Sequence, residues 1–216
     1  MKFNMNPIVK PTTTKERVYN EIKKVILNGY ISSKEVFTEV QLADSLNTSR
    51  TPVREALLDL MKEGLITSIP RKGMSIRKVT DKEIEQIFIV RASIESEVMK
   101  KLAETITEQQ LKQLKISCDQ QEKAMRDNDE VTFIHLDQQF HSTLIHLAGF
   151  ELIEQILLSF HNLSQLIGLK AIKRNNRMQE VLQEHRKILS TLEQRNAEAA
   201  VQTMVEHLQR TKQSIG

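Results

Sequence analysis

The sequence predicts a mainly α-helical protein, in which an N-terminal winged helix-turn-helix is followed by an all-α bundle of six antiparallel helices. All four prolines lie in the first 70 residues, and only three glycines follow Gly73, which favours long helices in the later part. Residues 1–80 carry 14 basic and 8 acidic side chains, whereas residues 81–216 carry 17 and 20. We therefore expect a flexible N-terminus at residues 1–12, a winged helix-turn-helix at 13–79 and a helical domain at 80–214.

The composition is that of a globular protein of one or two domains, with 39% hydrophobic and 27% charged residues in a chain of 216. The sequence has no apolar run of about 18 residues, and residues 1–11 lack the pattern of a signal peptide. These features predict a cytoplasmic protein without a membrane segment. Cys118 is the only cysteine, and its place in an apolar helical pattern predicts a small buried side chain.

The first two helices are short and amphipathic. Between Thr14 and Gly29, apolar residues recur at helical spacing, and Asn28-Gly29 ends the pattern. A second short pattern covers residues 39–46 and is followed by a tight turn at residues 47–49. This spacing predicts two helices, the second separated from the next helix by a tight turn.

The next helix, expected within Thr48–Gly64, has basic residues at its start and an apolar back. Thr51 fits the N-cap, Pro52 fits the first helical position, and Gly64 fits a left-handed C-terminal position. Arg50 and Arg54 lie off the apolar stripe, which comprises Val53, Ala56, Leu57 and Leu60. The two arginines are therefore expected to point outward.

Two β-rich runs follow, at residues 65–69 and 74–78, joined by the turn sequence Pro70-Arg71-Lys72-Gly73. Helix, turn, helix and hairpin make a winged helix-turn-helix, whose recognition helix enters the major groove of double-stranded DNA. Its arginines would read a guanine, while flanking hydroxyls would bind phosphates and the wing tip would meet the minor groove. The residues expected to contact DNA are Ser49, Arg50, Thr51, Arg54, Arg71, Lys72 and Gly73.

These residues resemble the DNA-binding domain of the GntR family of bacterial transcription regulators. The resemblance covers Ser49-Arg-Thr-Pro-Val-Arg-Glu-Ala-Leu57, Glu63-Gly-Leu-Ile66 and the wing tip Arg71-Lys-Gly73. Many members of that family have an arginine that reads a guanine at the start of the second helix, where this chain has Val40. We therefore expect base specificity to depend on Arg50, Arg54 and the wing.

After the wing, Thr80 and Glu83 form a capping-box pattern that begins the helical domain. Breaks in the periodicity predict helices at about 81–104, 108–127, 130–147, 151–174, 178–194 and 196–213. Asp137 and His141 lie four residues apart and so on one helical face, and His185 and His207 each lie in an apolar stripe. All four side chains should therefore point into the bundle.

A single histidine on an apolar face is more often a hydrogen-bonded core residue than a ligand. Burying three imidazoles and one carboxylate without partners would be costly, so we expect them to share a partner, and a divalent cation satisfies all four. The ligand set Asp137, His141, His185 and His207 favours Zn²⁺, with Ni²⁺ and Mn²⁺ as alternatives. His135, His146 and His161 fall outside this set.

The helical part resembles the FCD ligand-binding domain of the FadR subfamily of GntR regulators, in its shorter, VanR-like branch. The resemblance rests on Asp137-x-x-x-His141, Glu184-His-Arg186, Glu206-His-Leu208 and Val90-Arg91-x-x-x-Glu95. It implies a metal that keeps positions open for a small organic acid. Arg91 is the residue we expect to bind the carboxylate of this effector, although an ion pair with Glu95 explains it equally well.

Three hypotheses follow for the function. The first is a homodimeric transcription regulator, not an enzyme, that binds a palindromic operator under control of a metal-bound carboxylate metabolite. The second is a metal-dependent enzyme that uses the three-histidine, one-aspartate site, although the sequence shows no separate nucleophile or general base. The third is a regulator in which the metal is purely structural.

Overall fold

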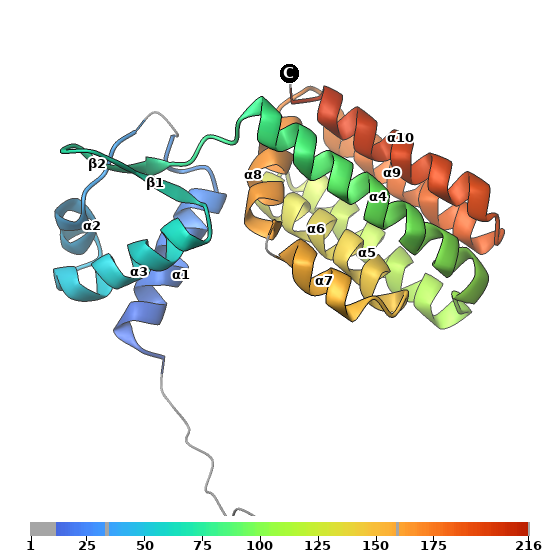
Figure 1. Cartoon of the computed structure of the whole chain (residues 1–216), viewed down its shortest axis with the longest axis horizontal. Coiled ribbons are helices and arrows are strands. Elements are labelled where there is room, and N and C mark those ends of the chain that lie inside the picture. Colours follow the sequence, from blue (N-terminus) through green and yellow to red (C-terminus); the bar gives the residue numbers. More distant parts are fainter. Residues whose placement is uncertain (1–11, 33–34, 159, 216) are drawn as a thin grey trace, which may run out of the picture. The chain divides into compact units, whose positions relative to one another are not determined.

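The computed structural model of the protein describes residues 12–32, 35–158 and 160–215. The chain divides into two compact units, one up to residue 78 and the other from residue 79 (Figure 1). The stretch expected to be flexible, residues 1–12, lies outside the described residues except for Thr12.

The N-terminal unit is a winged helix-turn-helix, which confirms this part of the predicted fold. Its elements are α1 (Thr14–Leu27), α2 (Glu39–Ser45), α3 (Arg50–Lys62), β1 (Ile66–Ile69) and β2 (Gly73–Ile76). The two strands are antiparallel, with Ile66 opposite Ile76, and Phe37 extends the sheet through two backbone hydrogen bonds with Met74. Val53, Leu57 and Leu60 of α3 are almost completely buried, as the apolar stripe predicts.

Helix α3 begins earlier than predicted. Its N-cap is Ser49 rather than Thr51, and Arg50 is its first helical residue, so that Pro52 lies third. The ring of Pro52 is tolerated there because the amides of the first helical turn have no partner within the helix. Gly64 adopts the predicted left-handed conformation at the other end, with φ +72°.

The second unit is all-helical, as predicted, but it has more helices than expected. In the described residues there are seven: α4 (Asp81–Thr105), α5 (Glu108–Arg126), α6 (Glu130–Leu147), α7 (Glu151–Leu158), α8 (His161–Ala171), α9 (Arg177–Glu193) and α10 (Ala197–Gln213). The predicted helix at 151–174 is therefore wrong. It divides into α7 and α8 at a turn in which the Phe160 amide bonds to the Leu157 carbonyl. The division lets α8 pack against both α6 and α10, while α7 contacts α6.

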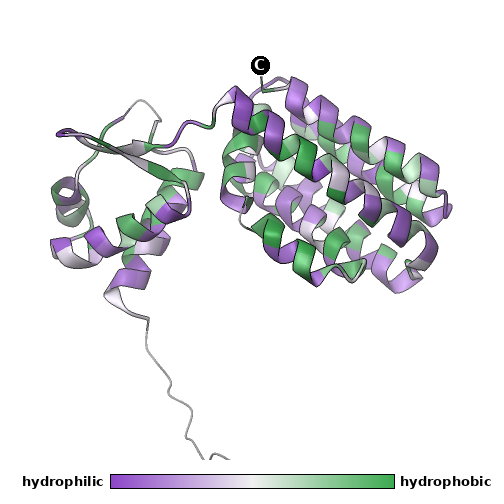
Figure 2. Ribbon diagram, viewed as in Figure 1, coloured by the Kyte–Doolittle hydropathy of each residue, from purple (hydrophilic) through white to green (hydrophobic). Residues whose placement is uncertain are grey.

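Apolar side chains from these helices form the core of the unit, and hydrophobic and hydrophilic residues alternate along each ribbon in Figure 2. Gly168 allows α8 to approach α6, because an added Cβ would lie 3.0 Å from Ile134. Cys118 is only 1% exposed, as predicted, and burial raises the pKa of its thiol to about 11. None of the helices in the described ranges is long and apolar enough to span a membrane.

Gly73 gives a test of the wing. It has φ +132°, and a Cβ at this position would overlap the carbonyl oxygen of Phe37, which accepts a hydrogen bond from the Met74 amide. We expect Gly73→Ala to destabilise the N-terminal unit by about 2 kcal/mol or more, from backbone strain and overlap together. Hydrogen exchange of the Met74 amide should accelerate accordingly.

The control is Gly29→Ala, because Gly29 also has a positive φ, +68°, but a Cβ there would meet no atom within 4 Å. This variant should lower the free energy of unfolding by about 1 kcal/mol, from the conformational strain alone. Equal effects of the two substitutions would show that the overlap at Gly73 is relieved without disturbing the sheet.

Candidate functional site

The candidate functional residues lie in two regions of the molecule, and the first region is around the start of α3. The side chains of Arg50 and Arg54 are 66% and 72% exposed, and both reach the carboxylate of Glu39 in α2, at 3.6 and 3.9 Å. Ser49 and Thr51 are also exposed on this first turn. The arginines are therefore oriented by a weak, solvent-exposed ion pair and remain accessible to another anion.

At the wing tip, Arg71 and Lys72 are exposed in the turn between β1 and β2. The Lys72 amide closes this turn on the Ile69 carbonyl, and Arg71 has a left-handed φ of +62°. A residue other than glycine is disfavoured in this conformation by about 1 kcal/mol, so the arginine is not there for its backbone preference. The cationic side chain better explains why an arginine occupies this position.

A single groove, here called the reading groove, connects these two regions. Of the seven predicted DNA-contacting residues, Ser49 and Thr51 do not line it. The groove is lined by Thr38, Glu39, Val40, Arg50, Arg54, Leu57, Leu58, Met61, Ser68, Ile69, Arg71, Lys72, Gly73 and Met74. The fold thus brings residues separated by more than 30 positions onto one cationic surface.

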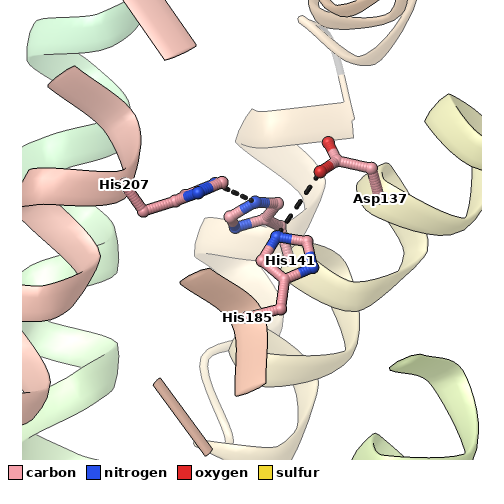
Figure 3. Close-up of side chains that lie close together, drawn as sticks. All are labelled: Asp137, His141, His185 and His207. Carbon is pink, nitrogen blue, oxygen red and sulfur yellow. Dashed lines mark hydrogen bonds and ion pairs between the residues drawn. The ribbon is translucent and has the colours of Figure 1, made fainter. Parts of the chain in front are cut away.

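The second region is a buried cluster inside the helical unit. It contains Asp137 and His141 from α6, His185 from α9 and His207 from α10, all at most 8% exposed. One potential ligand atom from each residue lies within 4.8 Å of the others (Figure 3). The structure therefore brings together the four side chains that the sequence predicted to point inward.

Each imidazole of the cluster has an acceptor at its Nδ1 atom. His141 donates to Glu95 Oε2 at 2.5 Å, His185 to Gln121 Oε1 at 2.9 Å, and His207 to Glu184 Oε2 at 2.7 Å. Because these oxygens only accept hydrogen bonds, each Nδ1 carries its proton. In a neutral imidazole, the lone pair is then at Nε2.

The Nε2 atoms face the centre of the cluster. Nε2 of His141 and Nε2 of His207 lie 3.2 Å apart, and Nε2 of His185, which has no hydrogen-bond partner, lies 3.5 Å from Asp137 Oδ1 (Figure 3). Two neutral imidazoles that both present lone pairs at this distance repel each other. A cation between them would convert this repulsion into attraction.

Two buried arginines support the acceptors. Arg91 Nε donates to Glu95 at 2.8 Å, and Arg177, which is completely buried, holds Glu184 through two hydrogen bonds of 2.8 and 2.9 Å. Burial alone would raise the pKa of Glu95, but Arg91 and His141 outweigh it and lower this pKa to about 2. Glu184 behaves alike, since His207 and Arg177 overcome its burial and lower its pKa to about 2. Both acceptors are therefore ionised at neutral pH.

Burial has the opposite effect on the imidazoles. It lowers the pKa of His185 well below the ordinary value of 6.5, and the neighbouring His207 and His141 lower it further. Burial also lowers the pKa of His207, although its hydrogen bond to Glu184 opposes this change. Neutral imidazoles are the form that binds metal ions.

The cluster fits a divalent cation. Nitrogen and oxygen ligands lie about 2.0–2.2 Å from Zn²⁺, so two ligand atoms on opposite sides of one ion are at most about 4.4 Å apart. In the structure, the four potential ligand atoms lie within 4.8 Å of one another, which is only slightly farther. A small inward movement of the side chains would bring these atoms to ligand distance. His141, His185, His207 and Asp137 would hold the ion, and the unpartnered Nε2 of His185 is the strongest sign of it.

A cavity adjoins the cluster on the side of His141. Arg91 lies in its wall, and its Nη2 atom is buried without a hydrogen-bond partner. The ion pair between Arg91 and Glu95, which the sequence suggested as the alternative to effector binding, is thus present. One guanidinium nitrogen of Arg91 still lacks a hydrogen-bond partner. His161, which the sequence placed outside the site, lines this cavity together with Glu95, Gln138, His141, Ser142, Ile145, Glu154, Leu157, Leu158 and Ser164.

Sequence reasoning missed two residues that support the cluster. Gln121 is a polar residue in the buried stripe of α5, and Arg177 is the first residue of α9. A glutamine at an apolar helical position is a signal that could have been used. Arg177 offers no such signal, because arginines at helix ends are usually solvated.

A winged helix-turn-helix with a cationic reading groove, joined to a helical unit with a buried ligand-type cluster, defines a two-domain DNA-binding regulator. Comparison with known proteins agrees with this class. Residues 14–76 match the family described as bacterial regulatory proteins, gntR family, and residues 86–210 match the FCD domain. The chain belongs to the GntR family of transcriptional regulators and carries an FCD domain.

Among its relatives, the HTH-type transcriptional regulator YdhC of Bacillus subtilis is 32% identical, covering 92% of this chain and 89% of that protein. The HTH-type transcriptional repressor RspR of Escherichia coli is 26% identical, covering 93% of this chain and 88% of its own. A GntR protein from Rhodococcus sp. RHA1 shares the fold with a TM-score of 0.81, at 22% identity, over 93% of this chain and 96% of that one. These relatives are transcription regulators, and they do not support the enzyme hypothesis.

The pKa shifts in the cluster predict that acid destabilises the metal-free chain. The folded state keeps His185 and His207 neutral, whereas the unfolded chain protonates them near pH 6.5, so stability should fall as the pH drops below about 6.5. The free energy of unfolding should fall by about 1.4 kcal/mol per pH unit for each imidazole that stays neutral in the folded state. Below about pH 4.5, Glu95 and Glu184 add to the loss, since they remain ionised in the folded state down to about pH 2.

Urea unfolding in the presence of a chelator, followed by helical circular dichroism between pH 7.5 and 5, measures this effect. The variant His135→Gln is the matched control, because His135 is exposed on α6 outside the cluster, and it should keep the slope of the wild type. A midpoint that is constant over this range would contradict neutral burial of the two imidazoles.

Proposed function

We propose that this regulator binds a palindromic operator as a homodimer, and that a small carboxylate metabolite bound at a metal site in the helical unit controls its affinity for DNA. The observation that carries the proposal is the set of three inward Nε2 atoms next to Asp137, beside a cavity lined by Arg91, whose buried Nη2 atom has no hydrogen-bond partner. Because its partner is chromosomal DNA, we place the protein in the cytoplasm.

In this proposal the reading groove contacts DNA. Arg50 or Arg54 reads a guanine in the major groove, because an arginine can form two hydrogen bonds with its O6 and N7 atoms. The hydroxyls of Ser49 and Thr51 bind phosphates, and Arg71, Lys72 and Gly73 meet the minor groove or its backbone. The exposure of these side chains and the strained backbone of Arg71 support this assignment.

The metal would be held by Asp137, His141, His185 and His207, and Zn²⁺ is favoured, with Ni²⁺ and Mn²⁺ as alternatives. The ion would supply positive charge and open positions for a carboxylate. Arg91 would bind the same carboxylate through Nη2, since Arg91 lines the cavity and this buried atom lacks a hydrogen-bond partner. Small organic acids are therefore the class of effector that the site suits.

The homodimer is supported by helix α7. None of its side chains is buried within the chain, and Leu152, Ile156 and Leu158 are 77%, 55% and 57% exposed. Exposed apolar side chains gathered on one element are typical of a protein interface. The operator would then repeat the site of one protomer in inverted orientation.

A purely structural metal is the alternative that the geometry also allows. In that case the ion would link α6, α9 and α10 without binding the acid itself. The adjacent cavity with its unsatisfied Arg91 nitrogen favours the sensing role.

The DNA contacts can be tested on an operator obtained by selection from random duplexes. If Arg54 reads a base, Arg54→Ala should weaken binding by about 1–3 kcal/mol and relax the preference at one position of each half-site. Lys62→Ala is the control, because Lys62 is an exposed cation at the far end of α3. A uniform loss on every duplex would instead identify Arg54 as a phosphate contact.

The metal site can be tested by elemental analysis of the purified protein. The wild type should carry about one divalent ion per chain, and His185→Ala should lose it, whereas His135→Ala should keep it. Operator affinity is then measured while acetate, succinate and citrate are titrated against metal-loaded protein, Arg91→Ala and chelated protein. An acid response that survives chelation would assign the metal a structural role, and no response to any acid would contradict effector control.

A further inference from the structure

Val40 is an exposed apolar residue within the reading groove. It is the second residue of α2, and 46% of its surface is exposed. Single exposed apolar residues are common and need no explanation. Val40 differs because it lines the same groove as the cations Arg50, Arg54, Arg71 and Lys72.

The position of Val40 is determined by contacts on both sides of it. Thr38 and Gln41 form a capping box, in which the Gln41 amide donates to Thr38 Oγ1 at 3.2 Å and the Thr38 amide donates to Gln41 Oε1 at 2.9 Å. Glu39 connects this first turn of α2 to Arg50 and Arg54 of α3. Whatever the arginines meet therefore lies close to Val40 as well.

The chemistry of the DNA groove then limits what Val40 can contact. Base edges in the major groove present hydrogen-bond donors and acceptors, and thymine adds the apolar C5-methyl group. An isopropyl group over a polar edge would remove water from it without replacing the hydrogen bond. Over a thymine methyl, both apolar groups are removed from water.

We propose that Val40 contacts the C5-methyl group of a thymine in each half-site and is a specificity-determining residue of this regulator. This inference rests on the proposed role of the reading groove. It adds a position to the operator that neither the arginines nor the wing would read. One methyl group removed from water corresponds to about fourfold in affinity, or about 0.8 kcal/mol.

The test uses the full-length protein and its operator, selected from a library of random duplexes. Each conserved thymine of the selected duplex is replaced in turn by deoxyuridine, which lacks only the methyl group. One thymine position in each half-site should respond. Each single replacement at that position should weaken wild-type binding about fourfold. The same replacement should have no effect on Val40→Gly, and Val40→Arg should select guanine at that base pair.

Leu58→Ala is the matched control, because Leu58 is 45% exposed and lines the same groove. It should retain the discrimination between thymine and uracil at the position assigned to Val40. Loss of this discrimination in Leu58→Ala but not in Val40→Gly would overturn the inference, as would a wild type that binds both duplexes equally. A library that yields no preferred sequence would overturn the inference together with the proposed reading groove.

Discussion

The interior of the helical unit depends on the outward-facing proton of each buried imidazole. His141, His185 and His207 donate this proton to acceptors on α4, α5 and α9, and so each ring is oriented with Nε2 toward the centre. Through these hydrogen bonds the cluster connects five helices, α4, α5, α6, α9 and α10. Without the acceptors the rings could rotate, and neither their spacing nor their tautomers would be defined.

The three acceptors are not equivalent. Glu95 and Glu184 are ionised and are each supported by an arginine, whereas Gln121 is neutral. A carboxylate that accepts from one imidazole nitrogen increases the basicity of the other nitrogen more than an amide does. His185, whose acceptor is an amide, would therefore be the weakest metal ligand of the three histidines. The arginines are necessary because an unpaired carboxylate in this position would be protonated or would destabilise the fold. A metal ion bound there would thus meet two stronger imidazole ligands, one weaker imidazole and a carboxylate.

Much of this arrangement follows from the sequence, and the exceptions have physical reasons. The convergence of Asp137 and the three histidines follows from helical spacing, because polar side chains in apolar stripes must face the interior. The break between α7 and α8 has no proline or glycine to mark it, and it accompanies the packing of α8 against α10 in addition to α6. The start of α3 was misplaced because Pro52 suits more than one position in the first turn. The support that Arg177 gives to Glu184 requires knowledge of the tertiary structure.

The length and position of α4 connect the buried cluster with the start of the helical unit. This helix of 25 residues begins at Asp81, directly after the Thr80 cap, and Arg91 and Glu95 lie in its middle. Ten residues of helix separate Asp81 from Arg91, about 15 Å at 1.5 Å per residue. Because a helix is stiff over this length, an axial shift or rotation of α4 at Glu95 displaces Thr80 by a comparable amount. Glu95, which accepts the hydrogen bond of His141, and Thr80 at the start of the helical unit are thus joined by one continuous helix.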